Sequence, residues 1–277
     1  MLDELKHLVL VVEHGTFTAA AHHAHLTQPA LSASIQRLEG WLGARLLDRG
    51  RHGATLTAAG VALLPRARAA VAAVEDGRRA IQEVLGLAVG EVRLGAGHTA
   101  CACLLPPVLA AFRRAYPGIR LSLREGFTAD LERAVDAGVL DLAILTGRGV
   151  EPWRTDRLVL VAAPGADAGA PFVTFAAPSP TRALVEQLFP EAEIAVEVGS
   201  IAAIKAHVEA GVGRALLSEV AIEEERARGT LELVAHPGLP ITRPLFLHHR
   251  GTERLPPAAG ALLAHLRGFD PLRRPAA

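Results

Sequence analysis

Residues 16–39, TFTAAAHHAHLTQPALSASIQRLE, decide the fold of the N-terminal region, because they spell two short helices joined by a tight turn. Thr16 is placed to cap a first helix with apolar residues at helical spacing, and Thr27 to cap a second one. Pro29 lies in the first turn of the second helix, where its missing N–H costs nothing. The stretch therefore predicts a helix-turn-helix, the layout that places one helix in a DNA groove.

The second helix has two different faces. Ala30, Leu31, Ile35 and Leu38 recur at helical spacing and are expected to face the core. The opposite face is polar, and short polar side chains with one arginine suit contacts to base edges and phosphates. The residues predicted to contact DNA here are Thr27, Gln28, Pro29, Ser32, Ser34 and Arg37. The alternative is a helical packing module with a solvated face, since helix-turn-helix shapes also occur without DNA.

Residues 44–60, ARLLDRGRHGATLTAAG, weaken that alternative. They contain two short apolar runs separated by a glycine-containing basic turn, the pattern of a β-hairpin wing. Arg49 and Arg51 lie near the predicted tip and join the predicted DNA contacts.

The segments EHGTFTAAA, LTQPALSASIQRLE, LGARLLDR and LTAAG resemble, in order and spacing, the N-terminal pattern of LysR-type transcriptional regulators. The resemblance continues to near the C-terminus. It implies a DNA-binding head, a dimerising linker helix and an effector-binding domain. The residue after Ser32 is often arginine in such proteins and is Ala33 here, so one phosphate or base contact is expected to be lost or moved elsewhere.

Residues 57–85 predict one long helix of roughly 40 Å at the standard rise per residue. Its apolar residues fall mostly three, four or seven apart, a narrow seam of the kind that pairs with another helix, so a homodimer is favoured over a solvent-bridging strut. Pro65 and Gly77 predict a kink or a weakened middle. The seam consists of Val61, Leu64, Ala67, Val71, Val74, Ile81 and Leu85.

After Gly90 short apolar strands alternate with helices, which predicts a parallel sheet covered by helices. Two such sets joined by crossing strands predict two lobes with a cleft between them. The predicted fold class is α plus α/β. Its domains are a winged helix-turn-helix at 1–58, a linker helix at 59–87 and a two-lobed, periplasmic-binding-protein-like α/β effector domain at 88–277, with lobe I at about 88–158 and 243–270 and lobe II at about 159–242.

Hydroxyl residues at three helix starts of this region favour a small anionic ligand, because backbone N–H groups there point outward. Hydroxyl residues at helix starts are more often simple caps. The hypothesis of an anionic ligand therefore depends on all three helix starts converging on one cleft. The candidates at these starts are His98, Thr99, Ala100, Ser179, Thr181, Arg182 and Ser200. Thr128 and Thr146, at other strand ends, are secondary candidates.

The resemblance is most detailed for a branch that includes regulators of carbon-fixation and sulfur genes. In that branch a threonine precedes Leu-Leu-Pro, as Thr99 precedes residues 104–106 here, and a second loop commonly reads Gly-Ser-Gly-Thr-Arg. Pro178 and Pro180 replace both glycines of the second loop, which stiffens it and removes backbone donors. Either the ligand differs from that of the better-known relatives, or this pocket is degraded.

The sequence predicts no catalytic residues, no metal site and no cofactor, since it lacks a Gly-x-Ser-x-Gly elbow, a Cys-His cluster and a P-loop. His22, His23 and His25 are too close in sequence to converge on one helix face and are interpreted as a solvated face near the DNA backbone. Cys101 and Cys103 are interpreted as core residues and not as a redox pair.

Charge is the unusual feature for a DNA-binding protein. Residues 1–58 contain five arginines and lysines and five acidic residues, whereas most nucleic-acid binders have a basic surplus. We therefore expect modest affinity per protomer, raised by oligomerisation.

The expected function is a ligand-responsive regulator that binds double-stranded promoter or operator DNA as a homodimer or homotetramer and senses a small anionic metabolite. The alternatives are a solute-binding protein or a small-molecule enzyme on the same two-lobed fold. Two cysteines, no apolar run long enough for a bilayer and acidic residues near the N-terminus favour the cytoplasm over export or a membrane.

Overall fold

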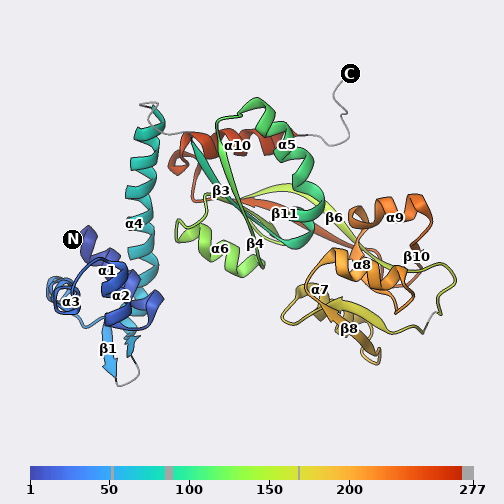
Figure 1. The fold of residues 1–277 in the computed structure, drawn as a ribbon, viewed down its shortest axis with the longest axis horizontal. Helices are drawn as coiled ribbons and strands as arrows, with labels where there is room; N and C mark the ends of the chain where they lie inside the picture. The colour runs from blue at the N-terminus through green and yellow to red at the C-terminus, as the bar shows by residue number, and fades with distance from the viewer. Residues whose placement is uncertain (51–52, 85–89, 168, 270–277) are drawn as a thin grey trace. The chain divides into compact units, whose positions relative to one another are not determined.

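The computed structural model describes residues 1–50, 53–84, 90–167 and 169–269 of the 277-residue chain. Two compact units are present (Figure 1). Unit 1 consists of Met1–Gly90, Arg133–Asp141 and Arg250–Pro257, and unit 2 of Glu91–Glu132, Leu142–His249 and the chain from Ala258 on. Together they confirm the predicted class, a helix-turn-helix region followed by a mixed α/β domain.

The N-terminal part of unit 1 is a winged helix-turn-helix. Thr16 and Thr27 cap the second and third helices as predicted, and their hydroxyls accept hydrogen bonds from the backbone of Ala19 (3.1 Å) and Ala30 (3.4 Å). The two strands pair antiparallel as the wing. The elements are α1 (Leu2–His14), α2 (Phe17–His23), α3 (Gln28–Leu42), β1 (Leu47–Gly50), β2 (Gly53–Leu56) and α4 (Ala58–Val84).

Helix α1 precedes the quoted helix-turn-helix stretch and completes its core. Leu8 and Val11 of α1 pack with Leu31, Ile35 and Leu38 of α3, all fully buried. The short helices α2 and α3 therefore depend on a third helix to cover their apolar sides.

The long helix α4 runs without interruption past both Pro65 and Gly77. Its predicted continuation to residue 87 lies outside the described residues. Gly138 shows how closely another segment of unit 1 approaches α4, because a Cβ built on this glycine would lie 1.9 Å from the Cβ of Ala72. Gly138 also has φ +73°, a backbone conformation that side-chain-bearing residues rarely adopt.

The apolar seam of α4 divides between two environments. Leu64 and Ala67 are buried within the protomer, whereas Val61, Val74 and Ile81 are each at least half exposed. Part of the seam therefore belongs to the core of unit 1, and the remainder is an uncovered apolar face.

Unit 2 is built on a seven-stranded sheet of order β10-β6-β11-β5-β3-β4, with β9 also paired to β6. Strand β3 is parallel to β4 and β5, as predicted, but β11 runs antiparallel to both β5 and β6. The sheet is mixed because the long strands β6 and β11 pass between the two helix-covered parts. The strands are β3 (Glu91–Ala96), β4 (Arg120–Glu125), β5 (Leu142–Thr146), β6 (Glu151–Ala162), β7 (Phe172–Phe175), β8 (Ile194–Val198), β9 (Ala215–Ser218), β10 (Glu232–Val234) and β11 (Ile241–His248).

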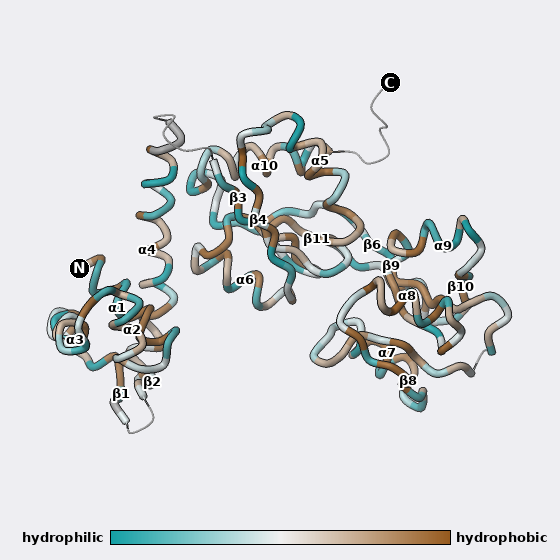
Figure 2. The backbone as a smooth tube through the Cα atoms, viewed as in Figure 1, coloured by the Kyte–Doolittle hydropathy of each residue, from teal (hydrophilic) through white to brown (hydrophobic). Residues whose placement is uncertain are grey.

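Strands β7 and β8 form a separate parallel pair. The hydrophobic stretches of the chain gather in the interior of the unit (Figure 2). Neither β10 nor α9 was expected from the sequence. Among the described helices, none has the length and apolarity that a bilayer span requires. The helices are η1 (Ala100–Leu104), α5 (Leu105–Ala115), α6 (Thr128–Asp136), α7 (Pro180–Leu188), α8 (Ile201–Glu209), η2 (Glu219–Ile222), α9 (Glu223–Arg228), η3 (Thr252–Arg254) and α10 (Pro257–Gly268), of which η3 and parts of α6 and α10 belong to unit 1.

Candidate functional site

The exposed face of α3 carries most of the residues predicted to contact DNA. Gln28 and Pro29 are exposed in the first turn, and Ser32 is half-buried one turn later. Arg37 is 63% exposed, and its Nε lies 3.3 Å from Oε1 of Glu4. Gln36 is exposed four residues after Ser32 and was not among the predicted contacts. Its helical spacing from Ser32 places it on the same face of α3 and could have indicated it.

Two orientations on α3 were predicted wrongly. Ser34 is only 1% exposed, and its hydroxyl lies 2.6 Å from Nδ1 of His7 on α1. Ser34 follows Leu31 by three positions and so falls on the buried stripe, where it cannot contact a base. Ala30, expected to face inward, is exposed.

Arg37 has an anionic neighbour within its own protomer. The pKa of Glu4 is lowered to about 2. The cause is a set of hydrogen bonds, from the N-terminal ammonium group, the Glu4 backbone and Arg37, which outweighs the opposite effect of burial. Glu4 therefore stays ionised at neutral pH. Because Arg37 is exposed, a DNA phosphate can replace this carboxylate at little cost.

The wing residues are described only in part. Arg49 lies on β1 with its backbone opposite Ala54. The Arg49 side chain and all of Arg51 lie outside the described residues, so the predicted wing contacts stay predictions.

A cavity of about 90 Å³ in unit 2 brings together most of the residues predicted to bind an effector. It is bounded by the starts of η1, α6 and α7 and by strands β5 and β11. Seven of the nine predicted residues line it, namely His98, Thr99, Ala100, Thr128, Thr146, Ser179 and Thr181. Three helix starts therefore border one small space, and helix N-termini favour negative charge.

Most hydroxyls around this cavity already accept hydrogen bonds. The hydroxyl of Thr128 accepts one from the backbone N–H of Thr146 (3.2 Å), and that of Ser179 caps α7 by accepting one from Arg182 (3.4 Å). Thr181 differs from them. Its side chain lines the cavity, the residue is only 8% exposed, and no described residue bonds its hydroxyl.

Arg243 on β11 is the charged residue of the cavity that the sequence analysis missed. Its Nε donates to Oδ2 of Asp156 at 2.6 Å and its Nη2 to the hydroxyl of Thr99 at 2.8 Å. Asp156 is buried and also accepts a hydrogen bond from Ser218 at 2.5 Å. The signal was the one arginine in the mainly apolar strand ITRPLFLH.

Comparison with known proteins assigns the chain to a family. The family described as "Bacterial regulatory helix-turn-helix protein, lysR family" matches residues 2–61, and the one described as "LysR substrate binding domain" matches residues 85–270. The chain belongs to the LysR family of bacterial transcriptional regulators.

Relatives along most of the chain agree with this assignment. The LysR-type chain is 31% identical to a probable RuBisCO transcriptional regulator of Nostoc sp., over 89% of this chain and 81% of that protein. It is 32% identical to the regulator CfxR of Cupriavidus necator, over 96% and 90% of the two chains. The crystal structure of ArgP from Mycobacterium tuberculosis shares the fold, with a TM-score of 0.70 at 22% identity over 96% and 97% of the two chains. Because the family consists of transcriptional regulators, the assignment excludes the alternative of a small-molecule enzyme.

Two predicted effector residues of this LysR-type regulator lie outside the cavity. Arg182 is held by carboxylates instead, with its Nε 2.8 Å from Glu186 and its Nη1 in an ion pair with Glu197. Hydrogen bonds to Glu186 and then Glu197 outweigh burial and raise the pKa of Arg182. Ser200 caps α8 through the backbone of Ala203 at 3.2 Å. Neither residue lines this cavity, so their predicted contacts to an effector stay predictions.

The cysteines of the regulator occupy protected positions. Cys101 donates a hydrogen bond to the carbonyl of Ala96 at 3.3 Å, and burial raises its pKa to about 12. Cys103 packs against the core around β7 and β9, and burial raises its pKa as well. Both observations support the interpretation as core residues, because a thiol with a raised pKa is a poor nucleophile at neutral pH.

The histidines of the helix-turn-helix do not gather into a metal site. His23 stacks on His14 with ring centroids 3.8 Å apart, and His22 meets His23 edge-on at 5.8 Å. Within the described residues no group of three or more metal-binding side chains occurs.

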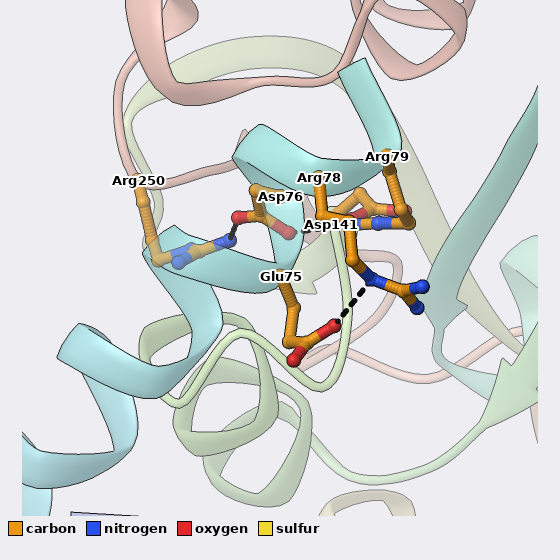
Figure 3. A network of polar contacts seen from close by, with 6 residues as sticks. All are labelled: Glu75, Asp76, Arg78, Arg79, Asp141 and Arg250. Atoms are coloured by element: carbon orange, nitrogen blue, oxygen red, sulfur yellow. Dashed lines mark hydrogen bonds and ion pairs between the residues drawn. The ribbon is translucent and has the colours of Figure 1, made fainter. Parts of the chain in front are cut away.

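A second charge cluster lies on α4 in unit 1 of the regulator (Figure 3). Arg79 Nη2 lies 2.5 Å from Asp76 and 2.8 Å from Asp141, and Arg250 forms an ion pair with the other oxygen of Asp76. Burial alone would lower the pKa of Arg79, but the hydrogen bonds to Asp141 and Asp76 outweigh it and raise the pKa above the ordinary value. Two arginines and two aspartates therefore balance each other, and they attach α4 to the segments that precede β5 and follow β11.

Proposed function

We propose that this LysR-type regulator binds a small anionic metabolite in the cavity of unit 2 and binds its promoter or operator DNA as a homodimer or homotetramer. The observation that supports the ligand is the set of groups around the cavity. Three helix starts, the guanidinium of Arg243 and the buried residue Thr181 all border it. Such groups bind carboxylate or phosphate oxygens.

DNA recognition is assigned to the exposed face of α3. Gln28 and Ser32 are proposed to read base edges, and Arg37 to bind a phosphate after releasing Glu4. Arg37→Ala should weaken binding to all sequences, and Gln28→Ala or Ser32→Ala should relax base preference, by about 1–3 kcal/mol for a true base contact. If all three variants bind DNA with the affinity and base preference of the wild type, the assignment is contradicted.

Oligomerisation is supported by the exposed part of the α4 seam. Val61, Val74 and Ile81 are large apolar residues without cover in the protomer. Ile81→Glu should shift the sedimentation of the full chain toward the monomer and weaken DNA binding, because the heads would no longer bind together. Arg66→Glu, an exposed charge reversal on the same helix that neighbours neither Val74 nor Ile81, is the control.

Signal transfer to the DNA-binding region is proposed to use strand β11. The strand carries Arg243 at the cavity, and the chain continues within seven residues to Arg250, which pairs with Asp76 on α4. A ligand that displaces Arg243 would therefore shift β11, and the ion pair between Arg250 and Asp76 would pass this shift to the linker helix α4. Saturating ligand that leaves the DNA footprint, bend and affinity unchanged would refute this coupling.

The ligand proposal is tested by a thermal-shift screen of the full chain against small organic and inorganic anions. A ligand at ~100 times its dissociation constant stabilises a protein by about 2.7 kcal/mol. Thr181→Val should abolish the shift. Thr174→Val is the matched control, because Thr174 is also buried, in β7, and does not line the cavity. No shift with any anion would favour a ligand-independent regulator.

We also propose a cytoplasmic location, since a regulator of this family acts where the chromosome lies. Fractionation of cells that express the tagged full chain tests it.

A further inference from the structure

A groove adjoins the effector cavity of unit 2 and shares Phe127, Ser179 and Pro180 with it. We propose that cavity and groove are one binding site and that its ligand is a monocarboxylate with an apolar, uncharged tail. The carboxylate occupies the cavity and the tail lies along the groove. This inference rests on the proposed effector function and specifies the chemical class of the effector.

The sizes of the two spaces support a ligand with a small head. The cavity has about 90 Å³, room for a carboxylate and few further atoms, whereas the groove has about 480 Å³. Sites for complete small molecules commonly span about 300–1,000 Å³. The cavity alone is below this range, and the cavity with the groove is within it.

The surface that lines the groove is mainly apolar. Ala177, Pro178, Pro180 and Ala183 form much of it, and neither proline has a backbone N–H to donate. A polyol or phosphorylated tail would lose water there with few partners in exchange, which is unfavourable. An alkyl or aryl tail loses no hydrogen bonds and gains from burial.

The charges at the groove oppose a second negative group. Its charged lining residues are Asp130, Arg182 and Glu186. Arg182, the cation among them, is already paired with Glu186 at 2.8 Å and with Glu197. The groove lining thus carries two carboxylates and one guanidinium that is already paired, so a dicarboxylate that places its far end here meets repulsion.

Titration calorimetry of the full chain with propionate, hexanoate and adipate tests the proposal. Hexanoate adds three methylenes to propionate, and adipate matches hexanoate in length but ends in a second carboxylate. Hexanoate should bind roughly tenfold more tightly than propionate, or better, since a fully buried methylene contributes about fourfold in affinity. Adipate should bind at least about tenfold more weakly than hexanoate.

Two substitutions locate the tail. Ala183→Glu places a charge in the groove and should weaken hexanoate about tenfold while leaving propionate unchanged. Ala202→Glu, an exposed alanine on α8 outside the groove, is the matched control and should change neither. Thr181→Val should remove binding of both acids, because it removes the head contact.

The outcomes distinguish the groove proposal from the anion cavity on which it rests. If propionate binds and Thr181→Val abolishes it, but hexanoate gains nothing or Ala183→Glu has no effect on hexanoate, the groove proposal is overturned and the anion cavity stands. Adipate binding as tightly as hexanoate overturns the uncharged tail. If none of the three acids binds the wild-type chain but the anion screen finds a ligand, the monocarboxylate proposal is overturned and the anion cavity stands. If neither experiment finds a ligand, both are overturned.

Discussion

Two arginines seven residues apart in the chain serve different purposes because their partners differ. Arg243, the third residue of β11, pairs with one carboxylate and one hydroxyl at the edge of a cavity. Arg250, two residues after β11, belongs to a set of two arginines and two aspartates that attaches neighbouring segments to α4. The first cluster keeps a polar surface for a ligand, and the second satisfies its charges internally. Arg243 is therefore assigned to the ligand because it borders the effector cavity, and Arg250 to the fold because its carboxylate partner lies on the linker helix.

The largest effect is expected at the α4 cluster. Asp141 is fully buried, and Arg79→Ala removes the guanidinium that binds both of its oxygens. The free energy of unfolding should fall by about 3–5 kcal/mol, since a buried charge loses its partner. Urea unfolding followed by circular dichroism measures it.

Arg78→Ala is the control for that experiment (Figure 3). Arg78 is 66% exposed and pairs with Glu75 at 3.1 Å, so its loss should cost less than about 1 kcal/mol. Equal effects of the two variants would remove the distinction between a structural cluster and a surface pair.

A smaller loss is expected from crowding the contact between α4 and residue 138. Gly138→Ala forces a Cβ to within 1.9 Å of Ala72 at positive φ and should cost about 2–4 kcal/mol. Gly147→Ala shares the positive φ but meets no atom within 4 Å, and should cost about 1 kcal/mol. If the two melting temperatures fall equally, α4 does not depend on this close approach.

Arg243→Lys and Arg250→Lys compare the two arginines directly. Each keeps its charge and loses the planar fork, so each should cost about 1–2 kcal/mol of stability. Only Arg243→Lys should also abolish the ligand-induced rise in melting temperature, because Arg243 borders the cavity. Loss of that rise in Arg250→Lys alone would reverse the assignment of the two clusters.

The smallest effect is a pH dependence at the rim of the α4 cluster. Hydrogen bonds from Lys6 and then Arg78 outweigh burial and lower the pKa of Glu75 below 4.5. The unfolded state therefore takes up the proton first, and the stabilisation, present above pH 4.5, is lost as pH falls through the folded-state pKa. Glu75 is well exposed, so the contribution is about a few tenths of a kcal/mol.

Glu75→Gln should remove this acid-side slope when the stability of the wild type and the variant is measured from pH 3 to 6. An unchanged slope would mean that another carboxylate produces it.

The sequence alone predicted those features that depend on local spacing. The caps Thr16 and Thr27, the wing, the long helix and the alternating strands and helices are all consequences of short-range patterns, and the structure contains each of them. The same patterns placed seven effector candidates around one cavity, because helix starts follow the carboxyl ends of β3 and β4 in the main sheet and of β7 in the separate pair.

Tertiary structure alone decided which side chains are available. Ser34 was predicted as a base contact, but α1 covers it. Arg182 on α7 was predicted as a ligand contact, but its guanidinium pairs with Glu197 on β8. Arg243 lies 144 residues from Thr99 in sequence, and no local pattern joins them. Spacing along a helix or strand determines the face on which a residue lies, whereas its free hydrogen-bonding groups depend on partners that only the folded chain brings near.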